Sequence, residues 1–167
     1  MSSQQSEMSF NDGGGMPPWA EVMKSFFSGD HQLFAALRME PNKVDKDGVS
    51  VFATIPDFFA YKDGESSAHP GAYTIILDTV FGFSIFAKIQ QPKAIATINL
   101  KTDYLRPIEI GTKIICSAEC HDVSGKIART RGDILDYDGR PLASATGAFM
   151  IASGGPDFAR LGKRQPA

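Results

Sequence analysis

The sequence predicts an α+β domain in which one long buried helix lies in the concave face of an antiparallel sheet of about five strands, with a further helix near the N-terminus. Two observations lead to this fold class. Residues 72–89 form an apolar stretch that contains no proline and whose only charged residues are Asp78 and Lys88. Between Ala94 and Ile151, four segments rich in strand-forming residues are joined by short turns. A helix that is apolar on most faces needs a covering surface, and a curved sheet provides one.

The composition is that of one ordinary globular domain. The chain has 167 residues, of which 43% are hydrophobic and 22% charged, and its formal net charge of −2 does not indicate nucleic acid or an anionic membrane as a partner. We recognise no basic and apolar leader, so neither secretion nor membrane insertion is expected. Cys116 and Cys120 are four residues apart in one predicted strand, about 13 Å, which is too far for a disulfide. We therefore expect reduced thiols and a cytoplasmic protein.

The N-terminal part is predicted to hold a tail, a helix and one strand. Residues 1–16 are polar and glycine-rich, which is typical of a disordered tail. Apolar residues recur at helical spacing over residues 19–38 and predict a helix, with a possible break at Ser28-Gly29-Asp30. Residues 48–55 are expected to form a strand that Pro56 ends.

The long helix is expected over residues 71–89. It follows a loop and the step His69-Pro70-Gly71, in which Pro70 suits a first helical turn because its missing N–H would have no partner there. Asp78 lies two turns inside this helix. A carboxylate at such a position loses much of its water, which is costly unless the group is paired, hydrogen-bonded or functional.

The C-terminal half is predicted to be a meander. Strands are expected over residues 94–104, 113–123, 126–137 and 141–151. Ser124-Gly125 and Asp138-Gly139 are hairpin signals, and Gly132 inside a strand indicates a bulge or bend. The single domain therefore spans residues 17–152, and residues 153–167 are expected to be a C-terminal tail.

Three motifs occur in order between about Gly48 and Ile151. The first is His69-Pro70-Gly71 with an acid, Asp78, nine residues after the histidine. The second ends the strand after the helix, with Asn99, Tyr104, Pro107 and Gly111. The third is the closing hairpin, which runs from Asp138-Gly139-Arg140 through Ala143, Ala145 and Gly147 to Phe149. Together they resemble the motifs of the hotdog-fold acyl-CoA thioesterases of the phenylacetate-pathway type, the PaaI-like proteins.

The resemblance implies a hotdog fold and hydrolysis of an acyl-CoA thioester at a subunit interface, by a homodimer or a dimer of dimers. It implies neither a metal nor a cofactor other than the coenzyme A of the substrate. By position, Asp78 would activate a water or attack the thioester carbon itself. Thr97 would place the water, and the Gly71 N–H would polarise the thioester carbonyl at the positive end of the helix. His69 would shape the loop or carry a proton.

Two departures from the family pattern keep an alternative open. The family has Gly directly after the histidine and uses its amide as oxyanion donor, whereas Pro70 has no N–H. It also commonly has Asn about six residues before the histidine, where this chain has Asp63. These departures favour a hotdog protein that binds acyl-CoA or a related ligand without turnover. An enoyl-CoA hydratase or acyl-carrier-protein dehydratase is a further alternative, which the spacing of His69 and Asp78 does not fit.

Four cations are candidates for binding the phosphates of coenzyme A. Lys126, Arg129 and Arg131 follow the Ser124-Gly125 turn, and Arg129 and Arg131 face the same side of their strand. They form either a solvated strand face or, as the resemblance implies, a phosphate cradle. Arg106 is the fourth candidate.

Three aromatic residues in the loop before His69 are candidates for lining an acyl pocket: Phe58, Phe59 and Tyr61.

Each of the predicted site residues could instead have a purely structural role. Aromatic residues pack in cores, Thr97 suits a strand through β-propensity alone, and Asp78 could bond a backbone amide.

Overall fold

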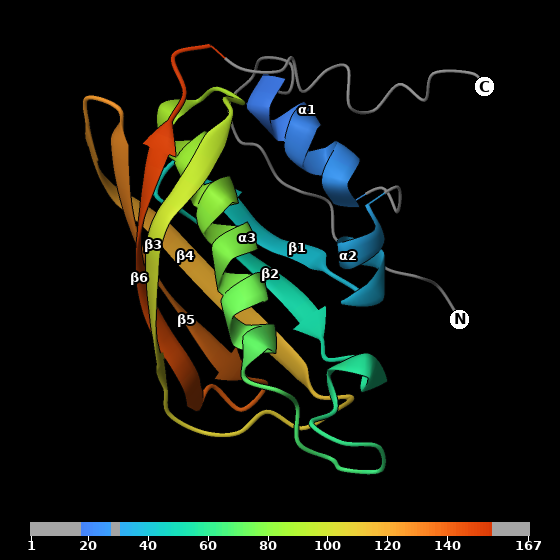
Figure 1. The fold of residues 1–167 in the computed structure, drawn as a ribbon. Coiled ribbons are helices and arrows are strands. Elements are labelled where there is room, and N and C mark those ends of the chain that lie inside the picture. The colour runs from blue at the N-terminus through green and yellow to red at the C-terminus, as the bar shows by residue number, and fades with distance from the viewer. Residues whose placement is uncertain (1–17, 28–30, 155–167) are drawn as a thin grey trace.

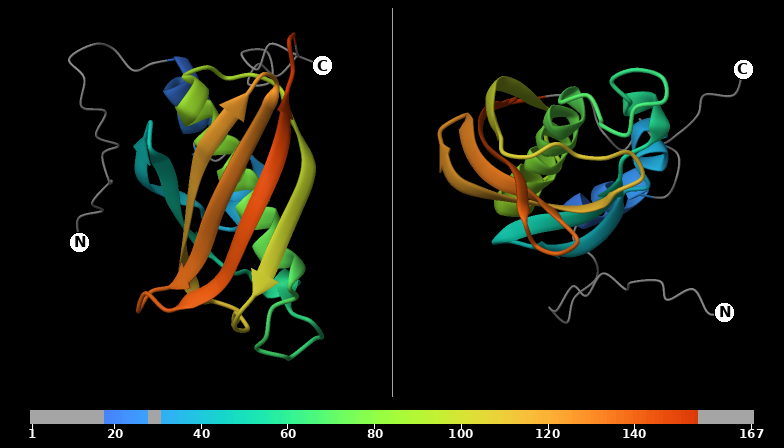
Figure 2. Two further views of the ribbon diagram at one scale, coloured as in Figure 1. Left: turned by 90° about the vertical axis from the view of Figure 1, so that its left-hand side faces the viewer. Right: turned by 90° about the horizontal axis from the view of Figure 1, so that it is seen from below.

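The computed structural model describes residues 18–27 and 31–154. The helices are α1 (Pro18–Ser25), α2 (Gln32–Ala36) and α3 (Gly71–Ile89), and a 3-10 turn covers Asp57–Phe59. The strands are β1 (Glu40–Asp45), β2 (Gly48–Thr54), β3 (Ile95–Tyr104), β4 (Lys113–Ser124), β5 (Ile127–Asp136) and β6 (Pro141–Ile151). They form one antiparallel sheet in the order β1-β2-β4-β5-β6-β3, and the sheet curves around α3 (Figure 1, Figure 2). This arrangement confirms the predicted α+β class.

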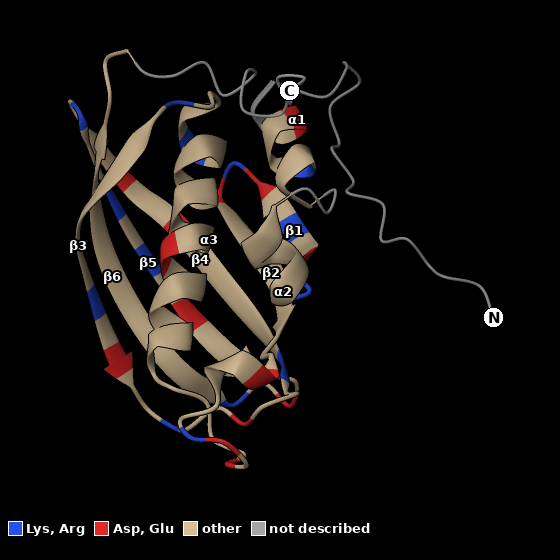
Figure 3. Ribbon diagram, turned by 45° about the vertical axis from the view of Figure 1, so that its right-hand side comes forward, with Lys and Arg blue, Asp and Glu red and all other residues tan. Residues whose placement is uncertain are grey.

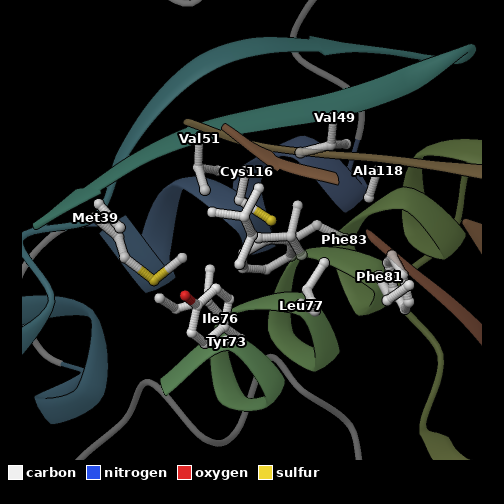
Figure 4. Packing of buried hydrophobic residues seen from close by; sticks show 14 of the residues in the cluster. Met39, Val49, Val51, Tyr73, Ile76, Leu77, Phe81, Phe83, Cys116 and Ala118 are labelled. Carbon is white, nitrogen blue, oxygen red and sulfur yellow. The ribbon is translucent and has the colours of Figure 1, made fainter. Parts of the chain in front are cut away.

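The core lies between α3 and the concave face of the sheet. Side chains along β4 and β5 alternate between buried and more exposed, as expected for a sheet that is covered on one face. Leu77, Phe81 and Phe83 of α3 pack with Val51 of β2 and Cys116 of β4 in this core (Figure 4). The apolar character of α3 is therefore accounted for by burial against the sheet.

The length and hydropathy of α3 are also those of a membrane span. However, 67% of its most apolar window is buried inside the fold, as in the core helix of a globular domain.

Gly132 lets α3 approach the sheet closely. A Cβ atom at this position would lie 2.3 Å from the backbone oxygen of Ser117 and 2.7 Å from the ring of Phe81. Phe81 thus occupies space that a side chain on β5 would otherwise fill. Of the bulge or bend predicted near Gly132, no bulge lies at Gly132 itself, which pairs regularly with Ala118 and Ala145. The register shifts on either side of it, between Cys120 and Asp122 against β5 and between Ile134 and Leu135 against β6.

The two N-terminal helices cover a second side of α3. Met23 of α1 and Leu37, which follows α2, are fully buried. Phe26 and Phe34 lie with their ring centroids 5.7 and 5.5 Å from Phe83 of α3. The helix predicted over residues 19–38 with a possible break corresponds to α1 and α2, which lie on either side of Ser28-Gly29-Asp30.

The structure has one strand more than expected. β1 was not predicted because Pro41 and Asn42 have low strand propensity. Pro41 is tolerated because β1 is an edge strand and its register shifts between Pro41 and Lys43. The other predicted strands are confirmed within two residues at their ends.

Three predictions fall mainly on residues outside those described: the tail over 1–16, the break at Ser28-Gly29-Asp30 and most of the tail over 153–167.

The two cysteines, which were predicted to be reduced thiols, lie among the described residues. Cys116 and Cys120 are free thiols buried on the helix side of β4. Burial raises the pKa of both thiols above the ordinary value.

Gly132→Ala is expected to destabilise the protein by about 2 kcal/mol or more, because the added methyl group overlaps backbone and a buried ring that cannot move apart cheaply. Gly154→Ala is the control, since a Cβ there meets nothing within 4 Å. Urea unfolding of both variants measures the difference. Equal midpoints would contradict the close approach of α3 to β5.

Tyr73 makes the stability depend on pH. Its hydroxyl donates to the backbone oxygen of Arg106, and burial raises its pKa from 10.0 to about 12. Between these values the unfolded chain loses the Tyr73 proton whereas the folded chain keeps it, so the free energy of unfolding should fall as the pH rises from about 10 to 12. Urea titrations across this range should show a smaller fall for Tyr73→Phe than for wild type. Identical pH slopes would contradict the assignment.

Candidate active site at the open side of α3

One side of α3 is covered neither by the sheet nor by α1 and α2. The residues of α3 that are not buried are Gly71, Thr74, Ile75, Asp78, Thr79, Lys88 and Ile89. The first five belong to the N-terminal half of the helix and recur at i, i+3, i+4, i+7 and i+8, so they form one stripe. Asp78 is the only acid on α3 and stands out as the red band in its middle (Figure 3).

Asp78 lies against the edge strand β3. Thr97 donates a hydrogen bond from Oγ1 to Asp78 Oδ1 at 2.7 Å. Thr97 is exposed and Asp78 is half-buried, so water reaches the carboxylate in the single chain. The expectation that Asp78 has lost much of its water is therefore only partly met, because the stripe of α3 that carries it faces outward.

Two local features bring Asp78 and Thr97 together. Gly82, one turn further along α3, has no side chain, and a Cβ there would lie 3.2 Å from Ile95 Cδ1 at the start of β3. A bulge between Thr97 and Asn99 then shifts the register of β3 against β6. β3 therefore crosses close to α3, and Thr97 lies on the face of the strand that looks at the helix.

His69 caps the N-terminus of α3. Its Nδ1 accepts a hydrogen bond from the Gly71 N–H at 2.9 Å, and its ring stacks on Tyr61 with a centroid distance of 5.6 Å and an angle of 11° between the planes. The next two amides of the helix are also used locally, since Ala72 donates to His69 O and Tyr73 to Pro70 O. The N–H that the sequence analysis assigns to the thioester, that of Gly71, thus already has an acceptor within the chain.

The loop before His69 is exposed. Asp63 lies on its surface, and Phe58 and Tyr61 are 65% and 58% exposed. Phe59 is partly buried against the core, with its ring 4.6 Å from that of Phe58. Phe58 and Tyr61 thus present aromatic surface near the start of α3, whereas Phe59 is mainly a core residue.

The structure does not bring the predicted phosphate cradle to Asp78 within one chain. Arg129 and Arg131 are on the face of β5 opposite to α3 and form ion pairs with Asp122 and Glu119. Lys126 directly precedes β5, which β6 separates from β3. Its carbonyl accepts from the Ile151 N–H, and Ile151 in turn pairs with Ile95.

Arg106 lies at the N-terminal end of α3. Its carbonyl accepts from Tyr73 in the first turn of the helix, and its exposed guanidinium donates to Pro141 O at 2.8 Å. Of the four predicted cations, Arg106 is thus the one anchored next to the N-terminus of α3.

A groove of about 660 Å³ lies on the outer face of the sheet. It is lined by Ser117, Arg131, Asp133 and Ser144, among others, and so is separated from Asp78 by the thickness of the sheet. The described residues hold no cluster of three or more His, Cys, Asp or Glu side chains that could bind a metal ion.

Four exposed apolar or aromatic residues on α3, on β3 and directly after β3 were not predicted as site residues: Ile75, Ile98, Tyr104 and Leu105. Tyr104 reaches α3, because its hydroxyl shares a hydrogen bond of 3.2 Å with Thr74. The sequence pattern gives no signal for Ile98, because it continues the alternation of β3 with Leu100. Its exposure comes with the bulge, in which Ile98 has no register partner on β6.

Comparison with known proteins points to one family. Residues 66–143 match the family model of the thioesterase superfamily. PaaI from the phenylacetic acid degradation operon of Escherichia coli shares 17% sequence identity, with a TM-score of 0.67 over 80% of this chain and 95% of that chain. A hypothetical thioesterase from Streptococcus pneumoniae, solved with coenzyme A, shares 18% identity, with a TM-score of 0.65 over 78% and 96%.

The protein smu.793 from Streptococcus mutans, solved with acetyl-CoA, shares 16% identity, with a TM-score of 0.60 over 68% of this chain and 88% of that chain. No curated protein sequence matches the chain. The matched residues run from the loop before His69 to the start of β6 and thus include α3 and β3. With its helix wrapped by a six-stranded antiparallel sheet, the chain is a hotdog-fold protein similar in fold to PaaI, and its residues 66–143 are similar to the thioesterase superfamily.

Proposed function

We propose that the protein hydrolyses acyl-CoA thioesters, with Asp78 as the catalytic carboxylate at a subunit interface. The observation that carries this proposal is the hydrogen bond of 2.7 Å from Thr97 to Asp78 on the open side of α3. It joins the two residues that the motif spacing assigns to the activation of water. The match of residues 66–143 to the thioesterase superfamily model supports the substrate class, as do the coenzyme A and acetyl-CoA bound to two structural neighbours.

The geometry of the pair suits general base catalysis. Thr97 occupies Oδ1 of Asp78, which leaves Oδ2 to accept a proton from a water. The water oxygen attacks the thioester carbon while its proton passes to Asp78, and the tetrahedral intermediate then breaks its C–S bond. The thiolate takes up the proton, so that one water and one thioester give one carboxylic acid and one free thiol.

Direct attack by Asp78 is the second route within the same proposal. The carboxylate oxygen bonds to the acyl carbon, coenzyme A leaves as thiolate, and water hydrolyses the resulting anhydride. The two routes give the same products and use the same side chain.

A second copy of the chain is the proposed cover of the site. The β3 edge is paired with β6 on one side only, which leaves backbone donors and acceptors free on the other. Ile98, Tyr104 and Leu105 next to this edge are 51%, 53% and 53% exposed, and Ile75 of α3 is 36% exposed. Burial of this patch in a homodimer would shield Asp78 from bulk water.

Binding without hydrolysis is the alternative function. It is favoured by the Gly71 N–H, which is already donated to His69, and by Pro70, which has no N–H. Loss of one oxyanion donor lowers turnover about 10²- to 10³-fold in enzymes that depend on it.

Thiol release from short, medium, long and aromatic acyl-CoAs tests the function. Cys116 and Cys120 are buried, so a thiol reagent should report mainly released coenzyme A. We expect turnover by wild type and a fall of about 10²- to 10⁴-fold in Asp78→Asn. Thr97→Val should lose about 10-fold or more, because the hydrogen bond to the carboxylate is lost, whereas Thr97→Ser should stay near wild type. Binding of acyl-CoA without turnover would instead establish the alternative.

Ile98→Glu is expected to convert the homodimer to a monomer, because it places a charge on the proposed apolar interface. Tyr137→Glu is the control: Tyr137 is 71% exposed and follows β5, away from the β3 edge. Sedimentation velocity measures the mass of each variant. A wild-type monomer, or dimers of equal strength in both variants, would contradict an interface at β3.

A further inference from the structure

We propose that His69 is the oxyanion donor of this enzyme, through its Nε2–H. The inference rests on the proposed thioester hydrolysis and concerns the group that stabilises its tetrahedral intermediate. It follows from three observations: the hydrogen bond to His69 Nδ1, the place of the imidazole on α3, and the chemistry of Pro70.

The hydrogen bond fixes the tautomer. His69 Nδ1 accepts the Gly71 N–H at 2.9 Å and so carries no proton of its own. A neutral imidazole has one N–H, which must then be at Nε2. The backbone of α3 therefore turns His69 into a donor whose N–H points away from the helix terminus.

The imidazole lies on the same side of α3 as Asp78. A Cβ atom at Gly71 would lie 3.0 Å from His69 Nδ1 and 3.5 Å from Cε1, so the ring occupies the direction in which a side chain at position 71 would project. Residues seven apart share one face of a helix, which places this direction and Asp78 in one stripe. Gly71 is thus required as a glycine because the imidazole takes the place of its side chain.

The distance along α3 leaves room for the reacting groups. Seven residues span about 10 Å of helix axis, and helical side chains tilt toward the N-terminus, so Asp78 leans toward His69. A thioester carbonyl and one water fit between an Nε2–H donor and a carboxylate at this spacing. The carbonyl oxygen would face His69, and the carbon would face the water on Asp78.

The orientation of the ring is held on its other face. Tyr61 stacks on His69 almost in parallel, and the His69 N–H donates to Phe59 O at 2.6 Å. His69 is nevertheless exposed, so its free edge can be reached by a substrate. A donor held in place in this way does not need to reorganise when negative charge develops on the carbonyl oxygen.

Pro70 explains why the chain needs such a donor. It has no N–H, and the amides of Gly71, Ala72 and Tyr73 have acceptors within the chain. The Gly71 N–H thus orients the His69 ring by donating to Nδ1. The ring in turn presents its Nε2–H to the substrate, in place of the backbone amide.

Matched substitutions at position 69 test the proposal. In His69→Asn the amide oxygen can accept from Gly71 and keep the cap, but no group reaches the position of Nε2. In His69→Gln the side-chain amide nitrogen can occupy that position. We expect kcat of His69→Asn to fall about 10²-fold or more with an unchanged melting temperature, and kcat of His69→Gln to stay within about tenfold of wild type. Wild-type turnover in His69→Asn, or equal losses in both variants, would overturn the proposal.

Asp78→Asn, assayed in parallel, separates this inference from the proposed function. If Asp78→Asn loses turnover and His69→Asn does not, the role of His69 alone is wrong. If wild type shows no turnover, both are wrong.

The tautomer can be measured without activity. Long-range ¹H–¹⁵N spectra at neutral or mildly basic pH distinguish the two neutral tautomers of each of the three histidines, and the signals missing in His69→Asn identify His69. The expected result is the Nε2–H tautomer. An Nδ1–H tautomer would overturn the proposal.

Discussion

The burial of α3 is the constraint on which the rest of the structure depends. Its apolar residues are covered by the concave sheet on one side and by α1 and α2 on another. Gly132 on β5 lets Phe81 pack directly against the sheet, and Gly82 on α3 lets β3 pass close to the helix. With these close contacts, α3 is covered on every side except one, and the uncovered side carries Asp78. The position of the candidate site is therefore a consequence of how the helix is covered.

The open side of α3 combines groups that hydrolysis of a thioester needs. Thr97 donates to Asp78, and Gly71 at the start of the helix donates to His69. In the proposed mechanism the first pair positions a water and His69 presents its other N–H to the substrate. The exposed β3 edge beside them supplies a surface on which a second subunit can exclude bulk water. The outer face of the sheet, with its polar groove and with Arg129 and Arg131 in ion pairs, offers no such combination.

Much of the fold could be predicted because its signals are local. The hairpin at Asp138-Gly139 and the apolar run over α3 determined the element bounds to within two residues. β1 was not predicted because its sequence contains Pro41, which argues against a strand. An edge strand such as β1 tolerates proline. The Asp78–Thr97 pair was predictable from motif spacing, whereas its exposure was not, although Gly71, Thr74, Asp78, Thr79 and Gly82 mark one small and polar stripe on the helix. The hydrogen bond from Gly71 to His69 depends on loop geometry that no sequence pattern specifies.

A crystal structure with an acyl-CoA analogue whose sulfur is replaced by CH₂ tests the proposed site most directly, because the analogue keeps the carbonyl and cannot be hydrolysed. We predict the carbonyl carbon next to Asp78 and Thr97, with its oxygen about 3 Å from His69 Nε2 and the β3 edge of a second subunit closing over the acyl chain. An analogue bound in the groove on the outer face of the sheet, or with its carbonyl out of reach of Asp78, would contradict it.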